Sequence, residues 1–260
     1  LVAGVVCLVL VLLVPTLHAM TRERYFQTVC AAHLAEIGRT MFVYAADNET
    51  ALPRAGGPMT TWGRLADWTG GTRQAAYALD ADGDCGKATI NSSFYLLVKY
   101  YQSPTGLFVC PGDEGTTEFS LAKTAGVSGV PANLELEDAW DFGPLAISWR
   151  SCSFAYHNPF GPYALTTTRD PNLAVAADRN PWITSPAGYP QVLSLFKPDL
   201  PGYIGATAKT GKAGNAIAHQ GEGQNVLFLD GRVTFETRAF CGLDHDNIYT
   251  ISMISDKGSA

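Results

Sequence analysis

The chain has 260 residues, and 47% of them are apolar, so it can bury a full hydrophobic core. This excludes a disordered tail and a small fold held together only by disulfides. The net charge is −6, from 18 Lys and Arg against 24 Asp and Glu. Because no excess of basic residues is available to contact phosphate backbones, nucleic acid is not expected as a partner.

The cysteines are widely scattered, and none forms a C-x-x-C pair. This spacing argues against a zinc ribbon or a thioredoxin-type site and fits disulfide bonds better. The pairing stays open at this point. The six residues are Cys7, Cys30, Cys85, Cys110, Cys152 and Cys241.

The first fourteen residues are apolar without interruption (LVAGVVCLVLVLLV), and Pro15 follows them. A membrane-spanning helix needs about 20 apolar residues, so this run is short for a complete span. One interpretation is a secretory signal peptide cut after Ala19, and another is a plain signal anchor. A third is the apolar half of one long helix that continues into the next segment.

Residues 21–47 predict an amphipathic helix. Their apolar residues recur at spacings of three and four and form one stripe: Phe26, Cys30, Leu34, Ile37, Met41 and Tyr44. The charged residues are expected to lie largely off that stripe: Arg22, Glu23, Arg24, Glu36 and Arg39. Asn48 and the Leu52-Pro53 step end the helix. If residues 1–47 form one rod bent at Pro15, its length is about 70 Å.

The rest of the chain predicts a head with several short elements. Residues 53–72 read as a loop with a helical turn at 62–68, and residues 93–101 as a helix. Short strands are expected at 107–111, 151–156 and 173–177, with an irregular excursion at 112–141.

The strongest local signal is Asp230-Gly231 between two β-rich runs, residues 225–229 and 232–236. An Asp-Gly pair in this setting predicts a tight hairpin, because glycine adopts positive φ without steric cost. The expected fold class is α+β, with a long N-terminal helix (1–50) packed against an antiparallel β-sheet head with long loops (51–260).

Asp80, Asp82 and Asp84 form the most ligand-like local pattern. Carboxylates at alternate positions repel each other unless a cation neutralises them, and Ca²⁺ prefers oxygen ligands from such loops. Cys85 and Asn91 occupy the positions where an EF-hand has glycine and glutamate, so that motif is not predicted. A Ca²⁺ ion and a solvated acidic turn both remain open.

His219, Asp178 and Asp230 allow a catalytic reading, because a histidine oriented by a carboxylate can act as a general base. The sequence has no G-x-S-x-G or H-E-x-x-H motif, and no cysteine has the local context of a thiol enzyme. We therefore expect no enzyme, and a structural polar cluster formed by His219, Asp178, Asp230 and Gly231. A hydrolase using His219 with Asp178 is the rival reading.

Five segments carry a resemblance to known proteins. The apolar run, Pro15 and the segment CAAHLAEIGRTMFVYAADNETALP (30–53) resemble the N-terminal helix of type IV pilin-like proteins and type II secretion pseudopilins. The segment 219–233 is similar to the histidine-to-Asp-Gly signature of a prepilin-type family, the H-X9-DG family, although ten residues separate His219 from Asp230. FVCPGD (108–113), AADRNP (176–181) and FCGLDHDNIYT (240–250) also resemble that family.

The resemblance implies a structural subunit that assembles with copies of itself into a helical filament. Its filament-core helix would include Val9, Leu13, Pro15, Phe26 and Ile37. The family implies a prepilin peptidase and an assembly machinery as partners, and calcium-binding members raise the expectation of Ca²⁺. It also implies an inner-membrane location before assembly and an extracellular or periplasmic filament afterwards. If Pro15 matches the family's kinking proline, about seven residues precede Leu1. The alternative function is a secreted carbohydrate- or protein-binding module released by cleavage after Ala19.

Overall fold

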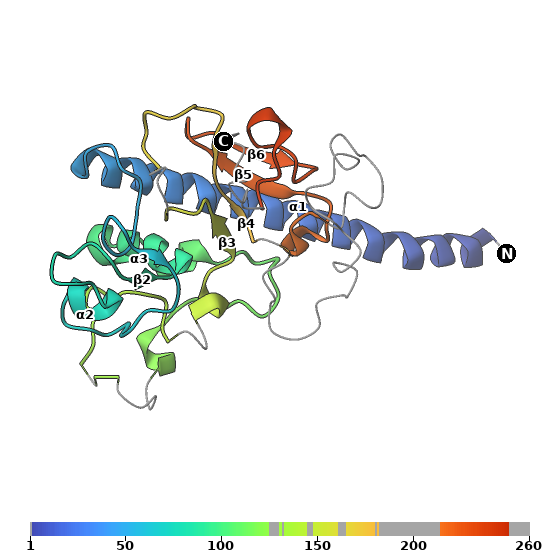
Figure 1. The fold of residues 1–260 in the computed structure, drawn as a ribbon. Helices are drawn as coiled ribbons and strands as arrows, with labels where there is room; N and C mark the ends of the chain where they lie inside the picture. Colours follow the sequence, from blue (N-terminus) through green and yellow to red (C-terminus); the bar gives the residue numbers. More distant parts are fainter. Residues whose placement is uncertain are drawn as a thin grey trace.

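The computed structural model describes residues 2–124, 130–131, 133–144, 148–160, 165–179, 181 and 214–249, with side chains described from residue 19 onward. The fold is α+β: a long N-terminal helix lies along a four-stranded antiparallel sheet, and a second helix packs beside it (Figure 1). The expected fold class is confirmed at this level.

Helix α1 runs without interruption over Val2–Asp47, about 70 Å at 1.5 Å per residue. Its C-terminal part lies on the head, whereas its N-terminal part projects beyond the sheet (Figure 1). Among the residues whose side chains are described, from residue 19 onward, no helix combines the length and apolar character needed to cross a bilayer. The helix ends where Asn48 Nδ2 donates a hydrogen bond to the Tyr44 carbonyl oxygen and where Glu49 and Thr50 adopt positive φ.

The predicted apolar stripe of α1 is confirmed in its C-terminal half. Between residues 19 and 29 every side chain is exposed or half-buried, and complete burial begins at Cys30. From there the buried side chains follow the expected spacing: Cys30, Leu34, Ile37, Met41 and Ala45. Ala45 rather than Tyr44 ends the buried stripe, because Tyr44 lies half-buried against Tyr101.

The sheet has the strand order β3-β4-β5-β6, and all neighbours are antiparallel. The strands are Phe154–Tyr156, Ala174–Asp178, Gln224–Phe228 and Val233–Glu236. The predicted hairpin joins β5 to β6, and Gly231 has φ 85° where its N–H donates to the Phe228 carbonyl. Glycine is favoured there because a Cβ would make this backbone conformation costly.

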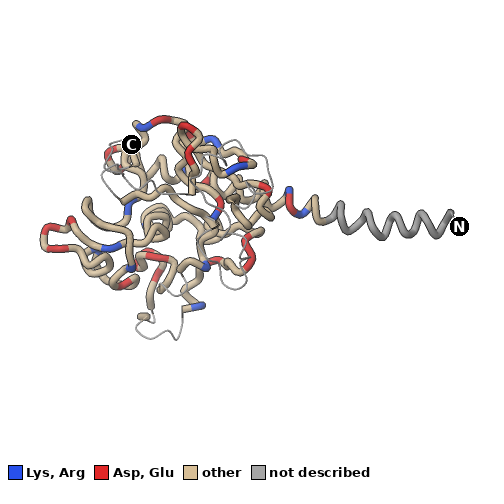
Figure 2. The backbone as a smooth tube through the Cα atoms, turned by 45° about the vertical axis from the view of Figure 1, so that its right-hand side comes forward, with Lys and Arg blue, Asp and Glu red and all other residues tan. Residues whose placement is uncertain are grey.

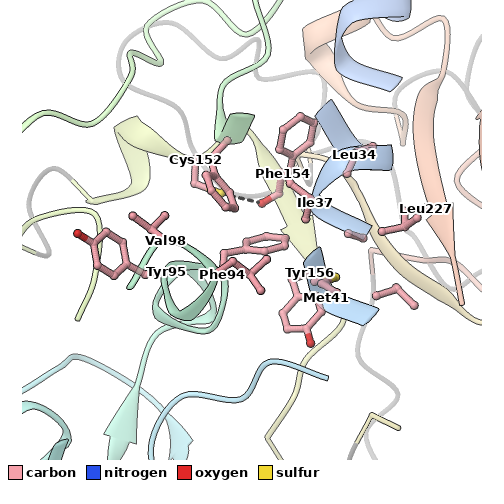
Figure 3. Packing of buried hydrophobic residues seen from close by; sticks show 14 of the residues in the cluster. Leu34, Ile37, Met41, Phe94, Tyr95, Val98, Cys152, Phe154, Tyr156 and Leu227 are labelled. Carbon is pink, nitrogen blue, oxygen red and sulfur yellow. Dashed lines mark hydrogen bonds between the residues drawn. The ribbon is translucent and has the colours of Figure 1, made fainter. Parts of the chain in front are cut away.

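The core forms where α1 meets the sheet and helix α3 (Ile90–Tyr101). Leu34, Ile37 and Met41 face Phe94 on α3 and the side chains of β3 and β5 (Figure 3). Gly38 permits the close approach of α1 to β5, since a Cβ there would lie 2.9 Å from a methyl carbon of Leu227. The helix predicted at 93–101 is confirmed and begins three residues earlier.

The remaining elements are short. Strands β1 (Thr61–Trp62) and β2 (Lys87–Ala88) form a parallel pair next to helix α2 (Arg73–Tyr77). The helical turn predicted at 62–68 is therefore wrong, because the backbone of Thr61 and Gly63 bonds to the 86–88 segment instead. Short 3-10 helices lie at Leu121–Thr124, Trp149–Ser151, Ile217–His219 and Leu243–His245.

The strand predicted at 107–111 is also wrong. Residues Thr105–Phe108 form a 3-10 helix, in which the Leu107 N–H donates to the Pro104 carbonyl. Proline fixes φ and initiates this turn, while the apolar side chain of Phe108 is buried from a helical rather than an extended backbone. The short apolar run alone does not distinguish these two conformations.

Acidic and basic positions are interspersed along the described part of the chain (Figure 2). This distribution accompanies the formal net charge of −6.

Candidate functional site

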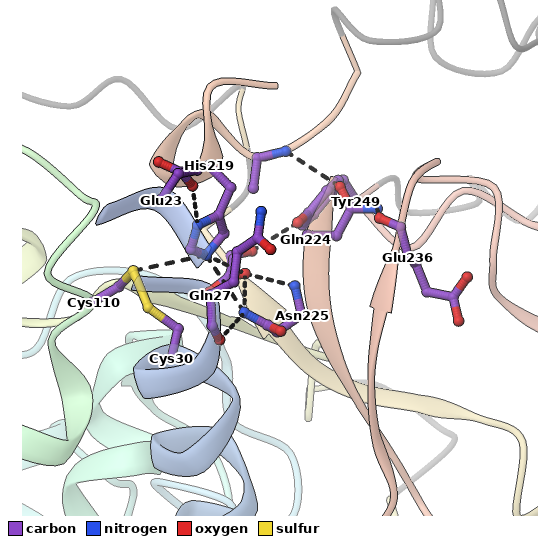
Figure 4. A network of polar contacts seen from close by, with 11 residues as sticks. Glu23, Gln27, Cys30, Cys110, His219, Gln224, Asn225, Glu236 and Tyr249 are labelled. Atoms are coloured by element: carbon purple, nitrogen blue, oxygen red, sulfur yellow. Dashed lines mark hydrogen bonds and ion pairs between the residues drawn. A yellow bond between two sulfur atoms is a disulfide. The ribbon is translucent and has the colours of Figure 1, made fainter. Parts of the chain in front are cut away.

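His219 lies at the centre of a buried group of polar side chains between α1 and the sheet (Figure 4). Its side chain is 0% exposed, and each ring nitrogen faces a carboxylate. Nδ1 lies 2.9 Å from Glu23 Oε1 on α1, and Nε2 lies 3.1 Å from Asp178 Oδ2 on β4. The imidazole therefore links the helix to the sheet directly.

Asn225 holds the carboxylate of Asp178 in place. Its backbone N–H donates to Asp178 Oδ2 at 2.6 Å, and its Nδ2 donates to the same oxygen at 3.1 Å. Nδ2 also lies 3.2 Å from the backbone carbonyl oxygen of Gln27 on α1. One amide side chain thus bonds to both the helix and β4, which limits the movement of either.

The disulfide Cys30–Cys110 borders the same group. It joins α1 to the segment that follows the 3-10 helix Thr105–Phe108, and Cys110 Sγ lies 3.9 Å from His219 Nε2. We call this set the polar cluster, and it consists of Glu23, Cys30, Cys110, Asp178, His219 and Asn225.

The electrostatics of the polar cluster favour a charged imidazole. Burial lowers the pKa of His219, but the hydrogen bonds and charges of Asp178 and Glu23 raise it, and the resulting pKa is above the ordinary value. An imidazolium between two carboxylates satisfies charges that would otherwise be costly to bury. This arrangement suits the cross-linking of two elements.

A second buried ion pair lies beside the polar cluster. Arg179 follows Asp178 directly, and its Nε lies 3.1 Å from Asp113 Oδ2, with both side chains buried. Arg179 also donates to the carbonyl oxygens of Trp149 and Cys152. The segment that carries Cys110 is therefore held at two points, by the disulfide and by this ion pair.

The segments quoted above for the family resemblance meet at this place. The helix contributes Glu23 and Cys30, residues 108–113 contribute Cys110 and Asp113, and residues 176–181 contribute Asp178 and Arg179. Residues 219–233 contribute His219. The segment 240–250 adds Tyr249, whose hydroxyl donates to the Asp178 carbonyl oxygen at 2.8 Å.

The structure brings together two of the four residues predicted for the structural cluster, His219 and Asp178. Asp230 and Gly231 lie at the tip of the β5–β6 hairpin, where Asp230 is ion-paired with Arg232. A hydrogen bond from the backbone N–H of Arg232 to Asp230 Oδ1 lowers the pKa of Asp230, and this bond stabilises the turn itself.

Glu23 and Asn225 were not expected in the site. Glu23 was assigned to the polar side of α1, but it lies seven residues before Cys30, which is two helical turns. A carboxylate that continues an apolar stripe is the signal that could have identified it. Asn225 gives no comparable signal, because it reads as the first residue of a strand.

Asp80, Asp82 and Asp84 lie in an exposed turn before β2. Asp80 Oδ1 accepts a hydrogen bond from the Asp84 backbone N–H at 2.8 Å, which lowers the pKa of Asp80. The three carboxylates are not among the described groups whose ligand atoms converge closely enough for a metal ion. Calcium binding by this turn stays a prediction.

The expected filament-core residues divide between two parts of α1. Ile37 is buried against the head, and Phe26 is half-buried beside Tyr25 and Arg22. Both therefore contribute to contacts within one chain. Val9, Leu13 and Pro15 lie within the helix, but their side chains lie outside the described part.

A separate recess of about 60 Å³ lies beside Asp141, lined also by Arg64, Trp68 and Thr89. Burial raises the pKa of Asp141 to about 7, although hydrogen bonds from Thr89 Oγ1 and the Phe142 N–H lower it. The recess has room for only a water-sized group or two.

No protein-family model, curated protein or solved structure matches the chain. The polar cluster combines a buried imidazole, two carboxylates and two sulfurs joined in a disulfide, which is a set suited to fixing α1 on the head.

Proposed function

We propose that the protein is a structural subunit of a pilin-like or pseudopilin-like extracellular filament, assembled through its N-terminal helix. One observation carries the proposal. Helix α1 is continuous over Val2–Asp47, yet the burial of its described side chains begins only at Cys30. Glu23 on α1 bonds to His219 of the head, and about 30 Å of helix, residues 2–22, precedes that contact.

The sequence of that projecting part supports assembly. Residues 1–14 are all apolar or glycine, and burying one Val or Leu side chain stabilises by about 1.5–3 kcal/mol. An apolar helix of this kind is stable in lipid or against the apolar helices of other copies. Subunits related by a rotation and a translation that do not close would form a filament.

The head supports the same role by holding α1 rigidly. The buried stripe fixes one face of the helix, and the polar cluster fixes its entry into the head through His219 and the Cys30–Cys110 disulfide. A helix that transmits contacts between subunits must be anchored in this way. The family resemblance of the five converging segments favours the same function.

Paired substitutions test the proposal. Val9→Asp with Leu13→Asp places two charges on the apolar segment, and Thr28→Asp with Ala32→Asp places two charges at the same spacing on exposed positions of α1. We expect the first pair to reduce the sedimentable polymer at least tenfold, and the second pair to retain it. The control pair should keep the melting temperature of the head within about 2 °C, since Thr28 and Ala32 are exposed. The proposal predicts the same for the first pair, because it assigns Val9 and Leu13 to contacts between subunits.

Wild-type-like sedimentation of the Val9→Asp, Leu13→Asp variant would contradict assembly through this helix. Mass spectrometry of the mature N-terminus provides an independent check. A mature chain that begins after Ala19 would favour the secreted binding module instead.

A further inference from the structure

Four side chains of the polar cluster carry the atoms that zinc binds most readily in proteins. Cys30, Cys110, Asp178 and His219 are all buried, and one ligand atom from each lies within 4.8 Å of the others. They come from α1, the segment after the Thr105–Phe108 helix, β4 and the 3-10 helix Ile217–His219. In this structure the two sulfurs are joined to each other.

The spacing of these atoms is close to that of a tetrahedral zinc site. Zinc bonds of about 2.0–2.3 Å place neighbouring ligand atoms roughly 3.3–3.8 Å apart. His219 Nε2 is 3.1 Å from Asp178 Oδ2 and 3.9 Å from Cys110 Sγ. Opening the disulfide and separating the sulfurs by roughly 1–2 Å would bring the sulfur–sulfur distance into this range, and the other pairs of ligand atoms already lie within 4.8 Å of one another.

The surroundings also fit a metal site. Zinc-binding histidines usually donate the second ring N–H to a carboxylate, and Glu23 Oε1 lies 2.9 Å from His219 Nδ1. Ligating carboxylates are themselves held by hydrogen bonds, as Asn225 holds Asp178 Oδ2. Asp178 Oδ1 is buried without a hydrogen-bond partner, so one oxygen of the 0% exposed carboxylate is left for a ligand.

We infer that reduction of the Cys30–Cys110 disulfide converts the polar cluster into a zinc site formed by Cys30, Cys110, Asp178 and His219. A dithiol reductant supplies two electrons and two protons, becomes a cyclic disulfide, and leaves two thiols on the protein. Zinc then displaces one proton from each thiol and the Nε2 proton of the His219 imidazolium, all three to solvent, and binds the deprotonated Nε2 while Nδ1 keeps its proton facing Glu23. The disulfide and the metal are alternative cross-links between α1 and the head.

Zinc binding by the full chain tests this inference. The protein is reduced with a dithiol, freed of reductant under inert gas, mixed with zinc chloride and passed through a desalting column. We expect one zinc ion per reduced chain by elemental mass spectrometry, and less than a tenth of that for the oxidised chain. Cobalt in place of zinc should give the visible absorption of a tetrahedral site with thiolate ligands.

Variants separate this site from other thiols. Cys30→Ser should weaken zinc binding at least 100-fold in the reduced chain, and Asp178→Asn about 10-fold or more. Cys85→Ser and Cys241→Ser are the matched controls and should retain one zinc per chain, because neither residue belongs to the polar cluster.

If reduction unfolds the chain, circular dichroism can measure whether zinc refolds it. We then expect zinc to restore the native spectrum of the wild type and not of Cys30→Ser. The inference is overturned if the folded reduced chain retains no zinc, if Cys30→Ser retains as much as the wild type, or if zinc fails to refold an unfolded reduced chain.

Discussion

The polar cluster and the acidic turn at residues 80–84 are both rich in carboxylates, but the fold treats them differently. In the polar cluster, His219 bonds to a residue 196 positions away, and Asp178 to one 47 positions away, with both side chains fully buried. In the turn, Asp80 bonds to the backbone of Asp84, and all three carboxylates are exposed. A carboxylate of the turn thus forms its hydrogen bond with a nearby backbone group and stays exposed to solvent. The buried side chains of the polar cluster need partners from distant parts of the chain.

Cysteine substitution should give the largest difference in the free energy of unfolding between these two regions, because only the polar cluster contains a disulfide. Cys30 and Cys110 close a loop with a sequence separation of 80 residues, so removing the bond should destabilise the fold by about 4.5 kcal/mol in the chain-entropy estimate. Urea unfolding of Cys30→Ala with Cys110→Ala, in the presence of a chelator, measures this loss. Cys85→Ser in the acidic turn is the control, and we expect a change within about 0.5 kcal/mol because its side chain is exposed.

An equal loss from the control would show that cysteine substitution itself, rather than the cross-link, destabilises the chain. A loss below about 1 kcal/mol in the double variant would mean that the disulfide does not anchor α1.

Removing one carboxylate from each region should give the next largest difference. Asp178→Ala deletes the partner of His219 and two hydrogen bonds from Asn225, and breaking a buried charge pair costs about 3–5 kcal/mol. Asp82→Ala should change the free energy of unfolding by less than about 0.5 kcal/mol, because the residue is exposed. Denaturant melts of both variants at one pH make the comparison, and similar losses would contradict it.

The smallest effect is a dependence of stability on pH. The pKa of His219 is raised in the folded protein, so its contribution is complete below its ordinary value of 6.5 and is lost as the pH rises through the raised value. We expect the free energy of unfolding of the oxidised, metal-free protein to fall as the pH rises above 6.5 and through the raised pKa. His219→Gln should remove this fall, because its amide does not titrate.

Asp141 must be separated from this effect. Its pKa is raised to about 7 from 3.8, so the folded protein binds the extra proton between these values and loses stability as the pH rises from about 4 to 7. Asp141→Asn should remove the loss of stability between about pH 4 and 7. It should leave the fall in stability assigned to His219 unchanged. If the free energy of unfolding of this variant did not fall as the pH rose above 6.5, the account of His219 would be contradicted.

The elements that the sequence predicted are those determined by local patterns. The 3.6-residue periodicity of residues 30–41 predicted the buried face of α1, and Asp230-Gly231 predicted the β5–β6 hairpin. The strand expected at 107–111 failed because a short apolar run fits a buried 3-10 helix as well as a strand. Pro104 precedes the 3-10 helix, and its carbonyl oxygen accepts the first hydrogen bond of the turn, from the Leu107 N–H.

The polar cluster could be predicted only in part for the same reason. His219 and Asp178 were expected to act together, but Glu23 and Asn225 enter the site through the packing of α1 on β4 and β5. The partner of Cys30 could not be deduced, because six scattered cysteines permit many pairings. Contacts between distant segments depend on the tertiary fold, which no local pattern encodes.

Electron microscopy of the purified full-length protein, imaged after detergent removal, tests the central claim most directly. The account predicts helical filaments in which the N-terminal parts of α1 from neighbouring subunits pack at the centre and the heads face outward. Dispersed single particles that retain residues 1–19 and stay monomeric at high concentration would contradict it.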